Sequence, residues 1–316
     1  NTPIMRFITT ERKVMASSTR TLESRRRREP KNGSTMAYLL VAPAALFVFL
    51  FLIVPIFYAF WCSLWRCDYM NFSKFLGLQN YLEVLTNKSF IRSFLLTMGV
   101  SLASYLISLV LGVLYAVWLD KLSKTTAYVL ELILLIPWVT SMVVSALLWQ
   151  WLFQDSLGLV NFLLNKVGLS SIKFLSSKNV VVWTLVFVLS WRLIAYAMIQ
   201  VLAGLKAIPK DYEEAAMIDG ANRFQMFWRV KIPMLKTPIA LSSMIILLSN
   251  INNVVVPRTL TGGGPGEATM VLGIKLYNES FMYYHFGESS AMSIVLCLIN
   301  FIFIYFYIKA IKYEIK

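Results

Sequence analysis

The sequence predicts an all-α, polytopic membrane protein with about six transmembrane helices, and three observations support this prediction. Of the 316 residues, 58% are hydrophobic and only 15% are charged, which is too apolar for an ordinary soluble domain of this length. The apolar residues fall into runs long enough to cross a bilayer core about 30 Å thick. The basic residues gather at the ends of these runs, as they do in membrane proteins that follow the positive-inside rule.

Each predicted span is a helix of roughly 20 predominantly apolar residues. In chain order the spans are Ala37 to Leu64, Ser93 to Leu119, Ala127 to Phe153, Val180 to Leu205, Ile239 to Val256 and Ala291 to Ala310. Two prolines, Pro137 and Pro257, are expected to bend or end a helix, because proline lacks an N–H and crowds the preceding turn.

The distribution of positive charge predicts the orientation. If the N-terminus is cytoplasmic, twenty of the thirty Lys and Arg residues fall on that side and eight on the other. We therefore expect both termini in the cytoplasm, with residues 1–36 as a basic tail that meets anionic lipid and residues 37–316 as the membrane domain. The net charge of +14 could suggest nucleic acid, but a soluble basic face is missing, so no nucleic-acid partner is predicted.

The sequence gives no sign of a metal site or a catalytic centre. Cys62, Cys67 and Cys297 lack metal-ligand spacing, and His285 has no evident nucleophile partner. Cys62 and Cys67 could pair outside the membrane, although small apolar fillers near the end of the first span are the favoured interpretation.

The long connection between the fourth and fifth spans, residues 206–238, is polar enough to leave the membrane and rich in helix formers. Asp211 is a predicted N-cap with Glu214 as its capping-box partner, and Gly220 can take the left-handed conformation that closes a helix. A second amphipathic stretch, Phe224 to Ile232, should end at Pro233. From physics alone, this segment is either a lever between two spans or an amphipathic helix on the headgroups.

The run Glu214-Ala215-Ala216-Met217-Ile218-Asp219-Gly220-Ala221, followed by Phe227, Ile232-Pro233 and Pro238, resembles the "EAA" loop of binding-protein-dependent ABC importers. Three further stretches are similar to the carbohydrate-uptake branch, which includes maltose, multiple-sugar and glycerol-phosphate permeases. They are Gly77 to Tyr81, Pro137-Trp138 through Trp149 to Asn161, and Thr261 to Pro265. The resemblance covers most of the chain from about residue 38 onward.

The resemblance implies the permease subunit of a type I importer, in the cytoplasmic (inner) membrane of a bacterium or archaeon. Residues 211–221 would form a coupling helix that docks on an ATPase subunit. The motif positions are Glu214, Ala215, Ala216, Asp219 and Gly220. The implied partners are a second permease in a heterodimer, two ATPase subunits that bind ATP and Mg, and an extracytoplasmic solute-binding protein. The chain itself would bind no cofactor and catalyse no reaction.

The glycine-rich run Thr261 to Gly266 is not a Walker A sequence, because no Lys-Ser/Thr follows it. Within it, Gly262, Gly263, Gly264 and Pro265 are either a flexible turn or, by the resemblance, a contact for the binding protein.

Polar residues within the spans are the candidates for a substrate pathway. Arg192, Tyr196 and Gln200 recur at four-residue intervals, which places them on one helical face, and Asn250 and Asn253 provide a similar face in the fifth span. Amide, guanidinium and phenol groups beside aromatic rings suit a sugar. The rival interpretation is interhelical hydrogen bonding.

Other classes remain open at this stage. The coupling-loop motif fits an ABC importer for a different solute, and Arg192 would suit an anionic one. An ion-coupled secondary transporter is expected to hold paired acidic residues in its spans, and only Glu131 is available. A membrane enzyme would need a catalytic constellation that the sequence does not provide.

Overall fold

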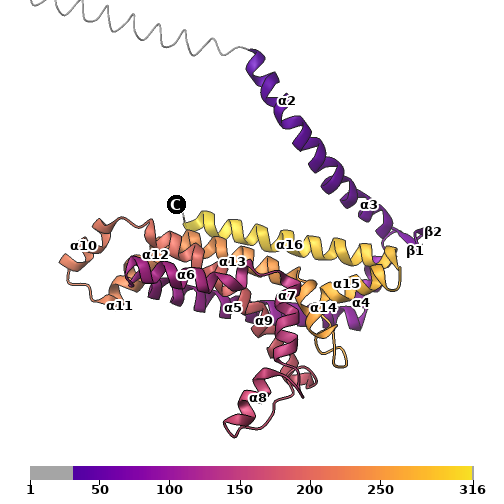
Figure 1. Cartoon of the computed structure of the whole chain (residues 1–316). Coiled ribbons are helices and arrows are strands. Elements are labelled where there is room, and N and C mark those ends of the chain that lie inside the picture. The colour runs from indigo at the N-terminus through magenta and orange to yellow at the C-terminus, as the bar shows by residue number, and fades with distance from the viewer. Residues whose placement is uncertain (1–30, 315–316) are drawn as a thin grey trace, which may run out of the picture. The chain divides into compact units, whose positions relative to one another are not determined.

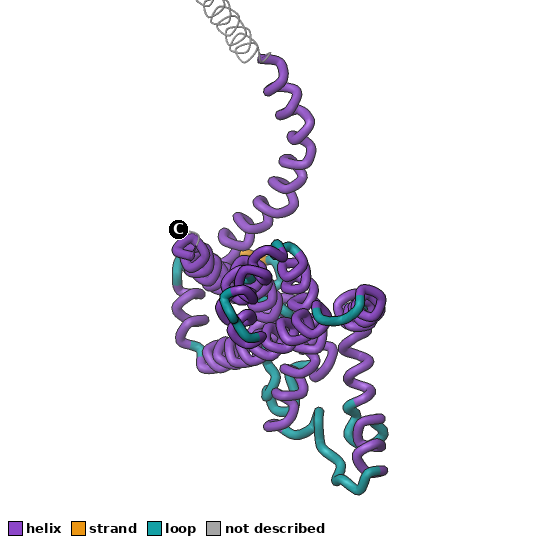
Figure 2. The backbone as a smooth tube through the Cα atoms, turned by 90° about the vertical axis from the view of Figure 1, so that its left-hand side faces the viewer, coloured by secondary structure: helices purple, strands orange, loops and turns teal. Residues whose placement is uncertain are grey.

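The computed structural model describes residues 31–314, with side chains for residues 38–309, and these residues are helical almost throughout (Figures 1 and 2). Most of the predicted basic tail, residues 1–30, lies outside the described residues. The chain divides into two compact units, residues 1–58 and residues 59–316. The predicted boundary at residue 36 stays a prediction.

The first unit is one apolar helical stretch that continues across its boundary. It is made of α2 (Lys31–Val48), the π-helical turn η1 (Phe49–Ile53) and the first residues of α3 (Val54–Ser63). Residues Tyr38–Ser63 qualify as a membrane span, and no residue of the tested window is buried. A helix that is apolar on every face and exposed to its surroundings suits a lipid environment.

The second unit holds the remaining elements in chain order. They are β1 (Trp65–Asp68), β2 (Asn71–Phe75), α4 (Gln79–Thr86), α5 (Lys88–Asp120), α6 (Lys124–Val139), α7 (Met142–Leu152), α8 (Leu159–Lys166), α9 (Lys178–Lys206), α10 (Lys210–Ile218), α11 (Arg223–Met226), η2 (Phe227–Lys231), α12 (Ile232–Met234), α13 (Lys236–Ile251), α14 (Val255–Thr261), α15 (Leu272–Phe281) and α16 (Phe286–Glu314). The two strands pair antiparallel. In Figure 1, α10 and α11 lie at one end of the long helices and α4, α14 and α15 at the other.

The predicted spans are recovered as four long helices and two bent pairs. Within the described part of the chain the long helices are Tyr38–Ser63, Lys88–Asp120, Lys178–Lys206 and Phe286–Lys309. The bent pairs are Lys124–Val139 with Met142–Leu152, and Arg223–Met234 with Lys236–Ile251. The prediction of about six apolar helices is therefore confirmed, on condition that each bent pair counts as one span.

Two predicted spans differ from the structure. The third is not one helix from Ala127 to Phe153: it bends by 94° after Val139, close to Pro137, which was predicted to disturb it. The fifth ends at Ile251 rather than Val256. Pro257 does not cause that ending, because it lies in the first turn of α14, where a missing N–H costs no helical hydrogen bond.

Helices α5 and α9 approach each other closely because small residues line their contact. Along α5 the buried positions include Ser104, Ser108 and Gly112. A Cβ on Gly112 would lie 2.4 Å from the Cβ of Ala197, closer than two side chains can come. The Ser108 hydroxyl donates to Ser104 O at 2.7 Å and to Ser190 O at 3.3 Å. Small side chains and hydroxyl hydrogen bonds are how membrane helices pack without a hydrophobic driving force.

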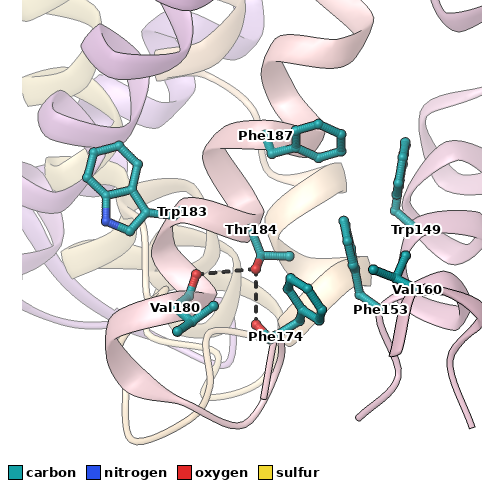
Figure 3. Close-up of a pocket in the computed structure, with 8 residues that line it drawn as sticks. All are labelled: Trp149, Phe153, Val160, Phe174, Val180, Trp183, Thr184 and Phe187. Atoms are coloured by element: carbon teal, nitrogen blue, oxygen red, sulfur yellow. Dashed lines mark hydrogen bonds between the residues drawn. The ribbon is translucent and has the colours of Figure 1, made fainter. Parts of the chain in front are cut away.

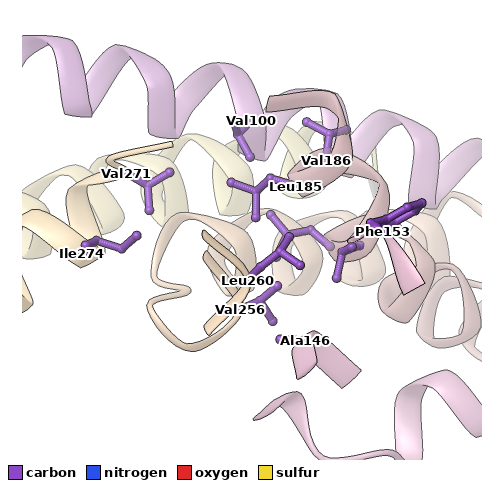
Figure 4. Packing of buried hydrophobic residues seen from close by; sticks show 11 residues of the cluster. Val100, Ala146, Phe153, Leu185, Val186, Val256, Leu260, Val271 and Ile274 are labelled. Atoms are coloured by element: carbon purple, nitrogen blue, oxygen red, sulfur yellow. The ribbon is translucent and has the colours of Figure 1, made fainter. Parts of the chain in front are cut away.

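Buried apolar residues gather where α5, α7, α9, α14 and α15 meet (Figure 4). Leu185, Val188, Val256 and Leu260 are at most 1% exposed in this cluster. This apolar cluster holds α7, α14 and α15 against the long helices α5 and α9.

Candidate functional site

The polar connection between α9 and α13 folds as predicted in its central part. Helix α10 ends at Ile218, and Gly220, just after the C-cap residue Asp219, has φ +80°. The N–H of Ala221 donates to Ala216 O at 3.0 Å and that of Gly220 to Met217 O at 3.1 Å. This pair of bonds is the Schellman motif, which satisfies the last carbonyls of a helix and favours glycine. The predicted left-handed conformation of Gly220, which closes the helix, is confirmed.

The start of α10 differs from the prediction. The helix begins at Lys210 after the N-cap residue Pro209, so Asp211 lies in the first turn and makes no cap. Acidic residues in a first turn still favour the helix, because the N-terminus carries partial positive charge. The capping box of this connection lies further on: Asn222 accepts from Gln225 N–H, and the Gln225 side chain accepts from Asn222 N–H, both at 2.9 Å.

The second amphipathic stretch continues past the predicted stop at Pro233. The chain forms α11, the π turn η2 and α12 and breaks at Leu235. A π turn next to a proline is consistent with the N–H that proline cannot donate.

The predicted docking residues lie on an open surface. Glu214, Ala215, Asp219 and Gly220 are exposed, and Ala216 is half-buried. Ile218 is 86% exposed and Met217 59% exposed, although both are apolar. Exposed apolar residues beside carboxylates are typical of a surface that a partner protein covers.

A charged cluster lies at the base of α10 and was not predicted. Lys231 Nζ is 2.9 Å from Glu213 Oε1 and 3.2 Å from Asp120 Oδ2, the last residue of α5. Asp120 and Lys231 are 111 positions apart, and each charge is ordinary for a helix end, so the sequence gives no signal for this cluster.

Arg192 is buried at the bend between α6 and α7. Its Nη1 donates to Thr140 O at 2.9 Å, and Nη2 lies 3.4 Å from Trp138 O. Both carbonyls become free where α6 ends, since no helical residue follows to donate to them. The geometry therefore gives Arg192 a structural task, which the sequence could not reveal because backbone carbonyls at a helix bend have no sequence signature.

Tyr196 and Gln200 continue the polar face of α9 as predicted. The Gln200 Nε2 amide donates to the Tyr196 hydroxyl at 3.3 Å, and the Tyr196 ring lies 4.8 Å from that of Trp138, centroid to centroid. The three candidates on α9 thus share a face, with an aromatic platform beside them.

The predicted polar face of Asn250 and Asn253 is not formed by one helix. Asn250 is buried and donates to Ser104 Oγ at 3.1 Å, which joins α13 to α5. Asn253 lies beyond the end of α13, and its Oδ1 accepts from Val256 N–H at the start of α14. Asn252, which was not among the candidates, exchanges amide hydrogen bonds with Asn300 of α16.

The glycine-rich loop is a hydrogen-bonded turn. The Thr269 hydroxyl donates to Gly264 O at 2.7 Å and lies 2.7 Å from the Thr261 hydroxyl. Gly262 and Gly263 have φ +60° and +94°, conformations that favour glycine. The sequence offered two interpretations: the loop does form a turn, and both its flexibility and the binding-protein contact stay predictions.

An aromatic pocket of about 470 Å³ opens beside α9 (Figure 3). Its walls include Trp149, Phe153, Trp183 and Phe187. The Thr184 hydroxyl faces it but lies within hydrogen-bonding distance of Phe174 O and Val180 O. Because that hydroxyl is already engaged, the pocket suits an apolar group better than a sugar.

His285 does not stand alone in the structure. Its Nδ1 lies 3.0 Å from Glu279 Oε2, and ligand atoms of Glu279, His285 and Glu288 lie within 4.8 Å of one another. The Lys275 ammonium is 3.7 Å from Glu279 Oε1 and supplies a countercharge. The group is therefore an ion-pair cluster between α15 and α16.

Comparison with known proteins decides the family. Residues 104–311 match the family described as "Binding-protein-dependent transport system inner membrane component". The chain belongs to this family. The predicted resemblance is thereby confirmed, and the chain is a multi-pass membrane protein of the permease class.

Relatives of this permease match it over nearly their whole length. The trehalose/maltose transport system permease protein MalF of Thermococcus litoralis is 32% identical, over 91% of this chain and 96% of the relative. The sn-glycerol-3-phosphate transport system permease protein UgpA of Agrobacterium fabrum is 30% identical, over 84% and 90%. A chain of a bacterial ABC transporter involved in the import of alginate has the same fold, with a TM-score of 0.80, 20% identity, and coverage of 90% and 98%.

Proposed function

We propose that this permease is the transmembrane subunit of an ATP-driven importer that moves a sugar or oligosaccharide into the cytoplasm. The solute is delivered by an extracytoplasmic binding protein, and residues 211–221 dock on an ATPase subunit, which binds ATP and Mg. A second, similar permease completes the membrane part as a heterodimer with two ATPase subunits. Both termini and the α10 connection lie in the cytoplasm, since twenty of the thirty basic residues then fall on that side. This chain catalyses no reaction.

The observation that carries this proposal is the exposed helix α10, which holds the motif residues between two apolar helices of a chain in this family. Rigid closure at Gly220 and continuity with α9 and α13 make it a lever, because force applied to it reaches both helices. Relatives that transport trehalose and maltose, and one for sn-glycerol-3-phosphate, support a sugar or sugar-like solute.

The proposal also includes the residues of the solute pathway. Arg192, Tyr196 and Gln200 line one face of α9 beside Trp138, and Asn250 and Asn253 flank the end of α13. The guanidinium of Arg192 is engaged by backbone carbonyls, so the proposal does not extend to the charge of the solute. The loop Gly262 to Pro265 is proposed as the contact for the binding protein.

The test compares two glycines with the same backbone conformation. A Cβ added at Gly220 (φ +80°) or at Gly168 (φ +83°) would meet nothing within 4 Å. A Gly→Ala change at either site costs about 1–2 kcal/mol of backbone strain. In the reconstituted complex, Gly220→Ala and Glu214→Lys should each lower sugar-stimulated ATP hydrolysis and uptake at least tenfold, with normal amounts of the chain in the membrane.

Gly168→Ala is the matched control, because Gly168 lies in the connection between α8 and α9, and it should leave transport within twofold. Normal transport by both Glu214→Lys and Gly220→Ala would rule out the docking role of α10.

A further inference from the structure

One ammonium group joins three segments at the base of α10. Lys231 ends η2, Glu213 lies in α10, and Asp120 is the last residue of α5. Lys231 Nζ lies within 3.2 Å of a carboxylate oxygen from each partner. A single side chain, that of Lys231, therefore links η2, α10 and the end of α5.

A cavity of about 770 Å³ lies beside this link, between α10 and the end of α5. It is lined by Val117 of α5 and by Lys121, which follows α5, and also by Met217 of α10 and Phe227 of η2. Lys231 and Glu213 also border it. Because a space of this size lies between the two elements, ion pairs rather than close apolar packing set their separation here.

The electrostatics make Lys231 more than an ordinary surface lysine. Its side chain is 17% exposed, so water and salt screen its ion pairs less than those of an exposed pair. The two carboxylate oxygens are at most about 6 Å apart, since both lie within 3.2 Å of one nitrogen. Without the ammonium the two carboxylates repel each other, and repulsion at this distance favours a larger separation of α10 from α5.

We infer that Lys231 is the positioning residue of the coupling helix: it ties α10 to α5, so that a displacement of α10 moves α5 as well as α9 and α13. This inference rests on the proposed function of α10. Helix α5 packs along α9 through Gly112 and the neighbouring serines, and Lys231 therefore adds a second route from α10 into the same helix pair.

The experiment compares Lys231→Met with Lys206→Met in the full complex. Lys206 also forms an ion pair, 3.5 Å from Glu131 Oε2, but that pair joins α9 to α6 and leaves α10 out. Lys231→Met should lower the amount of sugar moved per ATP hydrolysed at least fivefold. In Lys206→Met the same ratio should stay within twofold of that of the unmodified complex. Lys231→Arg keeps the charge, has the cavity to accommodate its longer side chain, and should restore coupling to within about twofold.

A direct readout of position accompanies the transport assay. Spin labels on Ile218→Cys in α10 and Lys121→Cys at the α5 end report their separation by double electron–electron resonance. Lys231→Met should lengthen and broaden the distance distribution, and Lys231→Arg should not. A merely stabilising lysine would lower the melting temperature in Lys231→Met and Lys206→Met alike without this change in distance.

Glu214→Lys separates the two proposals. If Glu214→Lys lowers sugar-stimulated ATP hydrolysis and uptake while Lys231→Met leaves both the sugar moved per ATP and the distance unchanged, the positioning role is refuted and the proposed function stands. If Glu214→Lys, Gly220→Ala and Lys231→Met all leave transport unchanged, both are refuted.

Discussion

The contact between α5 and α9 gives the sharpest prediction about stability, through Gly112→Ala. A Cβ at this position would lie 2.4 Å from Ala197 Cβ and 2.9 Å from the backbone nitrogen of Met198. Ordinary van der Waals contacts of a Cβ begin at 3.4 Å, so the two helices must separate by about 1 Å. The hydrogen bond from Ser108 Oγ to Ser190 O, already 3.3 Å long, would then be lost.

The magnitude follows from two opposing effects. Overpacking at a close helix contact costs about 1–3 kcal/mol. A Gly→Ala change in a helix where nothing crowds the new methyl group gains up to about 1 kcal/mol from helix propensity. Gly99 provides that second case on the same helix, because a Cβ there meets nothing within 4 Å. The propensity gain applies to both variants, since both glycines lie inside α5, and the two should therefore differ by the overpacking cost of about 1–3 kcal/mol in the free energy of unfolding.

Thermal unfolding of the full chain in lipid nanodiscs, followed by tryptophan fluorescence, measures this difference. Gly99→Ala should melt at or slightly above the temperature of the unmodified chain. Gly112→Ala should melt on the order of 5 °C below Gly99→Ala. Equal melting temperatures would mean that α5 and α9 do not approach as closely as the structure shows, and the account of their packing would be wrong.

Three further predictions concern single side chains. Arg192→Met leaves the Thr140 and Trp138 carbonyls without a donor and should lower the free energy of unfolding by about 2–4 kcal/mol, with a smaller loss for Arg192→Lys. An unchanged melting temperature in Arg192→Met would contradict the structural role. Burial, together with the neighbouring Cys62 and Asp68, raises the pKa of Cys67 to about 11. Maleimide labelling of Cys67 at pH 7 should therefore be far slower than in the denatured chain and should accelerate as the pH rises. Rapid labelling at pH 7 would refute this. Asn222→Ala removes the N-cap of α11 at a cost of about 1 kcal/mol and should speed tryptic cleavage after Arg223, whereas unchanged cleavage would show that the cap is dispensable.

The sequence predicted what depends on local composition. Apolar run length determined the number of candidate spans, and a glycine after a short polar helix predicted the Schellman closure at Gly220. The N-cap of α10 was predicted two residues too late, at Asp211, because Asp is a strong N-cap former. In the structure Pro209 holds the extended conformation that an N-cap needs.

What the sequence could not provide are contacts between distant segments. Arg192 looked like a solute-binding charge because its partners, the carbonyls at a helix bend, are backbone groups without a sequence signature. The ion pair of Lys231 with Asp120 was not predicted, because Asp120 belongs to another helix, 111 positions away. The close approach at Gly112 depends on Ala197, a residue that no pattern within α5 identifies.

The bend between α6 and α7 has a consequence for how such chains change over generations. A straight helix here would leave Arg192 as a bare cation among apolar groups, and a bent helix without the arginine would leave two carbonyls bare. Each single change is therefore selected against, and a lineage can lose one feature only together with the other. The arginine and the bend are therefore expected to be inherited as a unit.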